Sequence, residues 1–124
     1  MPDEDAIRAA NAAFYRAFND KDAAAMADAW AGDAPCSCIH PGWNLVTGRD
    51  AVIESWTTIL ANPDQPRIVV GGVTVVRTGE TALVICREFV GGTPLIATNA
   101  FVREDGAWRI YHHQAGYVAQ LENP

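Results

Sequence analysis

The feature that most constrains the fold is a single change in the spacing of apolar residues along the chain. Before residue 63, apolar side chains recur every three or four positions, which places them on one face of an α-helix. After residue 66, segments rich in β-branched and aromatic residues replace this spacing, and glycine-containing turns separate them. The sequence therefore predicts an α+β fold. With 124 residues, of which 49% are hydrophobic, the chain is long enough for one domain over residues 1–124 and too short for two.

Three helices are predicted in the first half of the chain. The first covers residues 3–19 and has acidic residues in its first turn, where the helix dipole favours them. Asp22 is expected to cap the second helix. The third begins at a capping-box variant formed by Thr47 and Asp50, and it ends at Asn62. The side chains expected on the buried faces are Ile7, Ala10, Phe14, Ala17, Phe18, Met26, Trp30, Val52, Ile53, Trp56, Ile59 and Leu60.

Four strands are predicted in the second half, as an antiparallel meander. They are R-I-V-V-G-G-V-T-V-V-R, T-A-L-V-I-C-R-E-F-V, L-I-A-T-N-A-F-V-R and A-W-R-I-Y-H-H-Q-A-G-Y-V. The Gly71-Gly72 pair inside the first strand predicts a bulge or a sharp bend. We therefore expect a strongly curved antiparallel sheet that wraps around the three helices as a cone, with a pocket at its wide end.

The charge balance limits the partners that the chain can bind, and the cysteine count indicates its redox compartment. A net charge of −6, from 9 Lys plus Arg and 15 Asp plus Glu, lacks the basic surface that nucleic acids and anionic membranes require. No apolar run approaches the roughly 18 residues that span a bilayer, and the opening M-P-D-E-D is acidic where a leader would be basic. Three cysteines cannot all pair, so thiols in a reducing compartment are expected. We expect a cytoplasmic protein that binds neither nucleic acid nor membrane.

Two tight turns assign the side chains of the predicted sheet to its faces. A two-residue turn at Asp105-Gly106 places Asn99 opposite His112, and directly opposed residues share a face. A similar turn at Gly91-Gly92 places Val84 on the same face. If either turn were one residue longer or shorter than assumed, the two faces would be exchanged. The face expected to point inward carries Val84, Cys86, Glu88, Asn99, Phe101, Ile110 and His112. The outer face, which is the more polar one, is expected to carry Leu83, Ile85, Arg87, Phe89, Ile96, Ala100, Val102, Arg109, Tyr111 and His113.

His112 is the strongest candidate for acid/base chemistry on the inner face. Its ordinary pKa of about 6.5 suits proton transfer at neutral pH. Asn99, its expected neighbour, could donate to a developing oxyanion, or it could simply satisfy the histidine in the interior. Glu88 is a candidate general base if it is desolvated, or one half of an ion pair with a helix arginine such as Arg16. The predicted catalytic set is therefore His112, Asn99 and Glu88, together with His40 from the first half of the chain.

The segment C-S-C-I-H-P-G-W, residues 36–43, raises the question of a metal site. Zinc hairpins bring two thiolates together with C-x-x-C, whereas C-x-C on an extended strand separates them by roughly 7 Å. We therefore expect Cys36 and Cys38 to be buried thiols, and we expect no metal or other cofactor. The sequence leaves open the alternative that His40 and His112 are two ligands of a metal ion. His40 either lines the pocket or fixes the following Pro-Gly turn. The expected ligand pocket, suited to a flat apolar molecule, consists of Trp30, Trp43, Trp56, Phe101, Ile110 and Cys86.

Two longer segments resemble a known family. They are H-P-G-W-N-L-V-T-G-R-D-A-V-I-E-S-W and T-N-A-F-V-R-E-D-G-A-W-R-I-Y-H-H-Q-A-G. Over essentially the whole chain, the sequence is similar to the SnoaL-like domains of the nuclear transport factor 2-like superfamily, which also holds ketosteroid isomerase, scytalone dehydratase and limonene epoxide hydrolase. The resemblance implies the cystatin-like α+β cone. It implies no single reaction, because this fold hosts isomerases, cyclases, dehydratases, hydrolases and association domains. The catalytic sets of ketosteroid isomerase and limonene epoxide hydrolase match no motif in this chain.

Two functions from different classes follow. The first is a cofactor-independent isomerase, cyclase or lyase that acts on a small apolar carbonyl compound, with His112 or His40 as acid/base and Asn99 polarising the carbonyl. The second is a non-catalytic ligand-binding or protein-association domain that uses the same pocket. A small apolar or aromatic molecule is the expected partner in both. A homodimer through the outer sheet face is also expected, because the apolar residues there would otherwise be exposed, and because the resemblance implies pairing through sheets.

Overall fold

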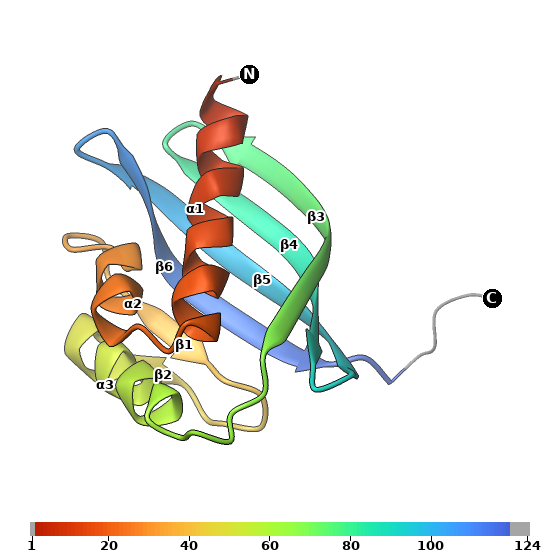
Figure 1. Cartoon of the computed structure of the whole chain (residues 1–124). Coiled ribbons are helices and arrows are strands. Elements are labelled where there is room, and N and C mark those ends of the chain that lie inside the picture. The colour runs from red at the N-terminus through yellow and green to blue at the C-terminus, as the bar shows by residue number, and fades with distance from the viewer. Residues whose placement is uncertain (1, 120–124) are drawn as a thin grey trace.

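A computed structural model describes residues 2–119 of the chain. Its elements, in chain order, are α1 (Pro2–Asn19), α2 (Ala23–Ala29), β1 (Ser37–Ile39), β2 (Val46–Thr47), α3 (Arg49–Leu60), β3 (Ile68–Thr78), β4 (Thr81–Val90), β5 (Thr93–Glu104) and β6 (Ala107–Tyr117). α1 crosses one face of the curved sheet, and α2 and α3 lie together beside the edge formed by β1 and β2 (Figure 1). None of the helices in the described part of the chain is long and apolar enough to cross a membrane. The predicted α+β class, with three helices and a curved sheet, is confirmed.

The sheet has six strands in the order β2-β1-β6-β5-β4-β3. The last four strands of the chain form the predicted antiparallel meander, whereas β1 pairs parallel to β6 and antiparallel to β2. The sheet is therefore mixed, and not purely antiparallel as predicted. β1 and β2 have only 3 and 2 residues, too few to show the two-residue period of a strand. Their pairing places Cys38 beside His113 of β6, which joins the C-S-C-I-H segment to the last strand.

The helix starts confirm one capping prediction and contradict another. Asp22 caps α2 as predicted, since its carboxylate accepts a hydrogen bond from a backbone N–H of the first turn at 3.0 Å. α3 lacks the predicted capping box, because Thr47 belongs to β2 and Gly48 is the capping residue, without a side-chain bond to the helix. Arg49 instead joins the start of α3 to the end of α2, because its guanidinium donates to the carbonyl oxygen of Ala27 at 2.8 Å.

The curvature of the sheet has a local cause in β3. The pairing register between β3 and β4 shifts between Gly71 and Thr74, and Gly72 has a φ of +58°, which residues with a side chain rarely adopt. The predicted bulge at this glycine pair is confirmed. The helices fill the concave side, where the largest fully buried side chains are Trp30, Phe14, Phe101, Ile7, Met26 and Ile110.

The hairpin of β4 and β5 has the predicted register. Val90 pairs with Thr93 across the two-residue turn, and Val84 pairs with Asn99. Val84, Cys86 and Asn99 are all buried. The prediction that these positions point inward, together with Glu88 on the same strand, is therefore confirmed.

A second irregularity, between β5 and β6, changes which histidine faces the interior. The pairing is as predicted as far as Ile110, but Asn99 then lies opposite His113 instead of His112, so Tyr111 is an extra residue on β6. Such a bulge exchanges the faces of the residues that follow it. His113 is 3% exposed on the inner face, and His112 is half-buried on the opposite face. The predictions that His112 points inward beside Asn99 and that His113 lies outside are therefore wrong.

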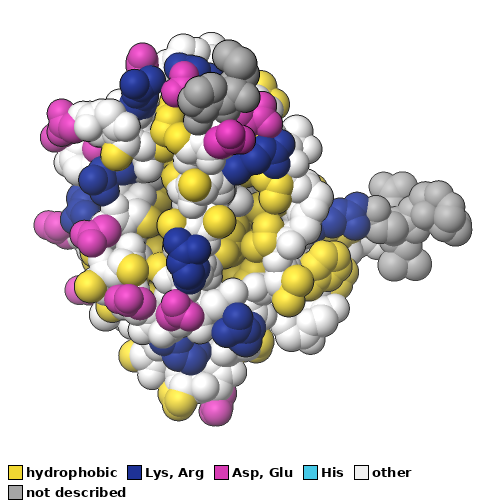
Figure 2. Space-filling model, turned by 45° about the horizontal axis from the view of Figure 1, so that its top comes forward, with side chains coloured by type: hydrophobic (Ala, Val, Ile, Leu, Met, Phe, Trp, Pro, Cys, Tyr) yellow, Lys and Arg dark blue, Asp and Glu magenta, His cyan; other side chains and the backbone are white. Residues whose placement is uncertain are grey.

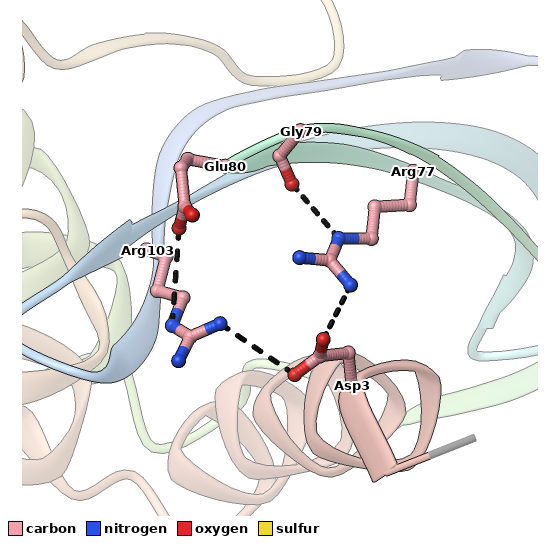
Figure 3. Close-up of polar contacts among 5 residues, drawn as sticks. All are labelled: Asp3, Arg77, Gly79, Glu80 and Arg103. Atoms are coloured by element: carbon pink, nitrogen blue, oxygen red, sulfur yellow. Dashed lines mark hydrogen bonds and ion pairs between the residues drawn. The ribbon is translucent and has the colours of Figure 1, made fainter.

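Ion pairs connect the N-terminal end of α1 to the two hairpins beside it. The carboxylate of Asp3 accepts a hydrogen bond from the guanidinium of Arg77 and lies 3.6 Å from that of Arg103, which is also 3.8 Å from Glu80 (Figure 3). Arg77 further donates to the carbonyl oxygen of Gly79 at 2.8 Å. With this end turned toward the viewer, acidic and basic side chains are intermixed over the surface and no histidine is visible (Figure 2). Exposed pairs of this kind contribute little stability individually.

Candidate functional site

A cavity opens at the other end of the molecule, beside the C-terminal end of α1. Its volume is ≈ 300 Å³, at the lower end of the range of about 300–1,000 Å³ that is typical of small-molecule sites. The aromatic and aliphatic part of its wall includes Phe18, Trp43, Trp56, Ile68, Val90 and Leu95. Its ionisable side chains are His40, Glu88, His113 and Tyr117. The described residues that line it include no Lys or Arg.

The residues predicted for the site fall into three groups. Those that line the cavity are His40, Trp43, Trp56 and Glu88. Those that are fully buried and do not reach it are Trp30, Cys86, Asn99, Phe101 and Ile110. His112 lies apart, on the other face of the sheet, where its Nδ1 is 2.7 Å from the hydroxyl oxygen of Ser37 and burial lowers its pKa. The structure therefore brings only part of the predicted set together.

Glu88 and His113 are connected behind the cavity wall by a chain of buried hydrogen bonds. The Tyr15 hydroxyl donates to Oε2 of Glu88 at 2.6 Å and accepts from Nδ2 of Asn99 at 3.0 Å. The same Asn99 nitrogen lies 2.9 Å from Oδ1 of Asn11, and Oδ1 of Asn99 lies 2.5 Å from Nδ1 of His113. Four elements therefore contribute to one network: α1 through Asn11 and Tyr15, β4 through Glu88, β5 through Asn99 and β6 through His113.

Burial shifts the pKa of Glu88. Desolvation raises the pKa of this carboxyl, and the hydrogen bond from Tyr15 opposes the change only in part. The pKa of Tyr15 is raised well above its ordinary value, first by burial and then by the neighbouring Glu88. Tyr15 is thus the partner of the carboxyl, and not Arg16, the alternative considered from the sequence.

Two buried histidines lie in the cavity wall. Burial lowers the pKa of His113 to about 3, and repulsion by His40 and His112 acts in the same direction. Burial lowers the pKa of His40 to about 4. Nε2 of His40 lies 2.9 Å from the hydroxyl oxygen of Ser55, and this hydroxyl donates to the carbonyl oxygen of Val52 at 2.7 Å. Both imidazoles are therefore neutral at pH 7.

His40 also fixes the turn at the rim of the cavity. Its carbonyl oxygen accepts a hydrogen bond from the backbone N–H of Trp43 at 2.8 Å, and the two rings lie 4.6 Å apart. Trp43 is 47% exposed, so it stands at the entrance. Trp56 contacts both histidines, with ring centroids 4.5 Å from His40 and 5.5 Å from His113. Both roles that the sequence left open for His40, in the pocket and in the turn, are present.

The three cysteines are buried free thiols, as predicted. Burial raises the pKa of Cys38 to about 12 and also raises the pKa values of Cys36 and Cys86. None of them is a reactive thiolate at neutral pH. Within residues 2–119, no group of three or more His, Cys, Asp or Glu side chains is arranged to hold a metal ion. The C-S-C-I-H segment instead supplies β1 and part of the cavity wall.

A comparison with protein families identifies the chain. Residues 7–120 match the sequence profile of the SnoaL-like domain. The chain belongs to this family. The SnoaL-like domain is also 29% identical over 115 residues to the F-box protein SKIP8 of Arabidopsis thaliana, a match that covers 91% of this chain and 50% of that protein. The chain thus spans about half the length of the curated relative that it matches.

Solved structures place the SnoaL-like domain in a wider superfamily. A candidate dehydratase of the NTF2-like family from Streptomyces avermitilis is 30% identical and matches with a TM-score of 0.89, covering 96% of this chain and 98% of that one. A candidate calcium/calmodulin-dependent protein kinase type II association domain from Thiobacillus denitrificans is also 30% identical, with a TM-score of 0.80 over 90% of this chain and 94% of that one. A protein with a cystatin-like fold from Nostoc punctiforme, 12% identical, shares the fold with a TM-score of 0.77 over 98% of this chain and 96% of that one. The predicted membership of the nuclear transport factor 2-like superfamily is confirmed.

Several polar residues of the SnoaL-like domain's site were not predicted from the sequence. Asn11 and Tyr15 lie on the buried face of α1, four positions apart, between Ile7 and Phe18. Polar residues at helical spacing within an apolar stripe were the available signal, because a buried polar group needs a partner. Ser55, which bonds His40, has the same signature on α3.

Proposed function

We propose that this SnoaL-like domain binds a small, uncharged, mostly apolar carbonyl compound and catalyses proton transfer at the carbon beside the carbonyl, as in an isomerisation or a dehydration. The observation that supports this most strongly is that a carboxyl and an imidazole, those of Glu88 and His113, line one apolar cavity. Burial raises the pKa of Glu88 and lowers that of His113, which favours a neutral acid beside a neutral base. Environments that shift the pKa values of two neighbouring groups in opposite directions are typical of acid/base sites. The similar candidate dehydratase from Streptomyces avermitilis supports the same class of reaction.

Each of the two groups would take one half of the proton transfer. In the dehydration of a β-hydroxy carbonyl compound, His113 takes the proton from the α-carbon, and Glu88 gives its proton to the leaving hydroxyl. The C–H and C–O bonds break, a C=C bond forms and water leaves. The proton on the imidazolium then returns to the carboxylate, so both groups regain their starting state. An isomerisation shares the first step and returns the proton to a different carbon.

His113 thus takes the acid/base role that the sequence suggested for His112. Asn99 does not polarise the substrate carbonyl in this proposal, because its amide is fully buried and bonded to Asn11, Tyr15 and His113. His40 contributes to the wall of the cavity and holds the entrance turn. The aromatic wall formed with Trp56 suits a flat substrate.

The composition of the wall predicts a preference for uncharged ligands. We expect 2-acetylnaphthalene to bind at least tenfold more tightly than 2-naphthoate, because a carboxylate would enter an apolar cavity beside Glu88 without a Lys or Arg to pair with among the described lining residues. Isothermal titration calorimetry at pH 7.5 measures both affinities. Thr93→Trp, a substitution at the mouth of the cavity, serves as the control and should weaken binding of the ketone. Equal affinity for the two compounds would contradict the proposed substrate class. Binding of the ketone that Thr93→Trp does not weaken would contradict the proposed cavity.

A second candidate function, in association, rests on the outer face of the sheet. Leu83 and Ile96 are 41% and 48% exposed there, and Val76 of the neighbouring strand β3 is 50% exposed. Ile85, Phe89, Val102 and Tyr111 are half-buried beside them, whereas Ala100 is buried. An apolar sheet face of this kind is suited to pairing with a second copy. The similarity to a candidate kinase association domain supports this use of the fold.

Ile85→Asp is expected to dissociate a homodimer formed through this face, because it places a charge at the centre of a desolvated interface. Light scattering at micromolar concentration should give twice the chain mass of 13.4 kDa for the unaltered protein and the chain mass for the variant. Thr58→Asp, which adds the same charge at an exposed position of α3, should leave the dimer intact. A monomer before substitution would remove the proposal of dimerisation without affecting that of the cavity.

A further inference from the structure

We infer that Asn99 is a positioning residue that fixes the tautomer of His113, so that Nδ1 carries the hydrogen and Nε2 presents its lone pair to the cavity. This inference rests on the proposed function, since it specifies which nitrogen accepts the substrate proton. The residue carrying it, Asn99, does not reach the cavity and is 0% exposed. It can therefore act only through the side chains that it contacts.

The first step concerns the orientation of the Asn99 amide. Its Nδ2 has two acceptors, Oδ1 of Asn11 at 2.9 Å and the hydroxyl oxygen of Tyr15 at 3.0 Å. Asn11 is itself oriented, because its side-chain hydrogen bond lowers the pKa of the Cys86 thiol, as an amide N–H donating to the sulfur does. A reversed Asn99 amide would place its oxygen against Oδ1 of Asn11, two acceptors without a hydrogen between them. The amide nitrogen therefore points to α1, and the amide oxygen points to His113.

The second step concerns the imidazole. Oδ1 of Asn99 lies 2.5 Å from Nδ1 of His113 and can only accept a hydrogen bond. Nδ1 must then carry the hydrogen, because the other neutral tautomer would oppose two lone pairs at this distance. A neutral imidazole with a hydrogen on Nδ1 has a free lone pair on Nε2.

The third step concerns where Nε2 lies. His113 lines the cavity, and Nε2 has no hydrogen-bond partner among the described residues. In the described part of the chain, the buried side-chain nitrogen and oxygen atoms without a partner are the indole nitrogens of Trp30 and Trp56. Nε2 of His113 is therefore open to the cavity, where a substrate proton can reach it.

The same chain of bonds fixes the other end of the network. Tyr15 accepts from Asn99, so its single hydroxyl hydrogen is available for Oε2 of Glu88 at 2.6 Å. Every donor in the chain therefore points from His113 toward Glu88. Bonds aligned in this way strengthen one another in a buried network. Oε2 is occupied as an acceptor, which leaves Oε1 of Glu88 to carry the acidic hydrogen that the proposed reaction requires.

The surroundings of His113 contain few other groups that could determine its protonation. Cys38 pairs with it from β1, and its raised pKa keeps the thiol neutral. His40 and His112 act on it only as neighbouring bases, which disfavour its imidazolium form. Tyr15 and Glu88 reach it through Asn99.

Nitrogen NMR of the histidine side chains tests the inference without a substrate. The chain has three histidines, so uniform ¹⁵N labelling and a long-range ¹H–¹⁵N spectrum at pH 7.5 give three pairs of ring signals, which His40→Gln and His112→Gln assign. We expect His113 to show a protonated Nδ1 and an unprotonated Nε2. Ser55→Ala, which removes the partner of His40 and not of His113, should leave that pattern unchanged. A protonated Nε2 on His113, or an average of both tautomers, would overturn the inference.

The pKa of His113 in Asn99→Asp provides a second measurement, which would not change if Asn99 had only a structural role. A carboxylate at this position would accept the same hydrogen bond and add a negative charge, so the pKa of His113 should rise by at least one unit, a tenfold change in proton affinity. If Asn99→Asp does not fold, the spectrum of the unaltered protein still decides. A correct tautomer with no proton-transfer activity would remove the proposed function and keep the positioning role. Proton-transfer activity with the other tautomer would remove the positioning role and keep the proposed function.

Discussion

Acidification from pH 6.5 to 4.5 is expected to destabilise the folded protein by several kcal/mol. The cause is the pair of buried histidines, whose pKa values are about 4 for His40 and about 3 for His113, compared with about 6.5 in the unfolded chain. Below pH 6.5 these two histidines bind protons in the unfolded chain and not in the folded protein, so the free energy of unfolding falls as the pH falls. Burial also lowers the pKa of the half-buried His112, which adds to the fall. The loss for His40 ends near pH 4, and that for His113 continues to near pH 3.

The size of the effect follows from proton linkage. Each histidine lowers the free energy of unfolding by up to about 1.4 kcal/mol per pH unit, and therefore by roughly 2 kcal/mol between pH 6.5 and 4.5, since the unfolded histidine is already half protonated at pH 6.5. Glu88 acts in the opposite direction, because its raised pKa lets the folded protein bind a proton before the unfolded chain does. The net loss is therefore smaller than the sum for the two histidines. It remains a large share of the roughly 5–15 kcal/mol that stabilises a typical domain.

Urea unfolding at pH 7.0, 6.0, 5.0 and 4.5 measures this loss, and two substitutions separate its causes. His40→Gln should make the pH dependence shallower by about one proton. Glu88→Gln should make it steeper, because it removes the group that offsets the histidines. His112→Gln is the matched control on the other face of the sheet and should change the slope least. A free energy of unfolding that stays constant from pH 7.0 to 4.5 would show that the two imidazoles are not held neutral by burial.

The fold could be predicted because its local signals agree with its global arrangement. Helical spacing over residues 3–19, Asp22 at the start of α2 and the glycine pair in β3 each correspond to what the structure shows. The two-residue turn between β4 and β5 fixed the register of that hairpin, and with it the inward direction of Glu88 and Asn99. In these places a few neighbouring residues determine the geometry.

The candidate site could be predicted only in part, because a bulge depends on contacts distant in sequence. Tyr111 is the extra residue of β6, and neither glycine nor proline stands there to indicate it. One unpaired residue exchanged the roles of His112 and His113, as a register shift must in a strand whose side chains alternate. The parallel pairing of β1 with β6, which brings Cys38 beside His113, joins segments 75 residues apart and has no local signal.

Exchange of α-protons for deuterium measures the proposed proton abstraction directly and requires no knowledge of the natural substrate. With 2-acetylnaphthalene in buffered D₂O, the protein should accelerate loss of the methyl proton signal well above the rate in buffer. His113→Gln should reduce the accelerated rate by about 10²–10⁴-fold, the contribution typical of a positioned base. Glu88→Gln should reduce it less, because this ketone has no leaving hydroxyl for the carboxyl to protonate. Both substitutions act on groups that line the cavity.

His112→Gln is the matched control for this exchange experiment, because His112 lies outside the cavity on the opposite face of the sheet. One-dimensional proton NMR follows all four proteins at equal concentration. The proposed function predicts rapid exchange with the unaltered protein and with His112→Gln, and slow exchange with His113→Gln, whereas the rate with Glu88→Gln should lie between them. Exchange no faster than in buffer, or exchange that depends on His112 and not on His113, would contradict it.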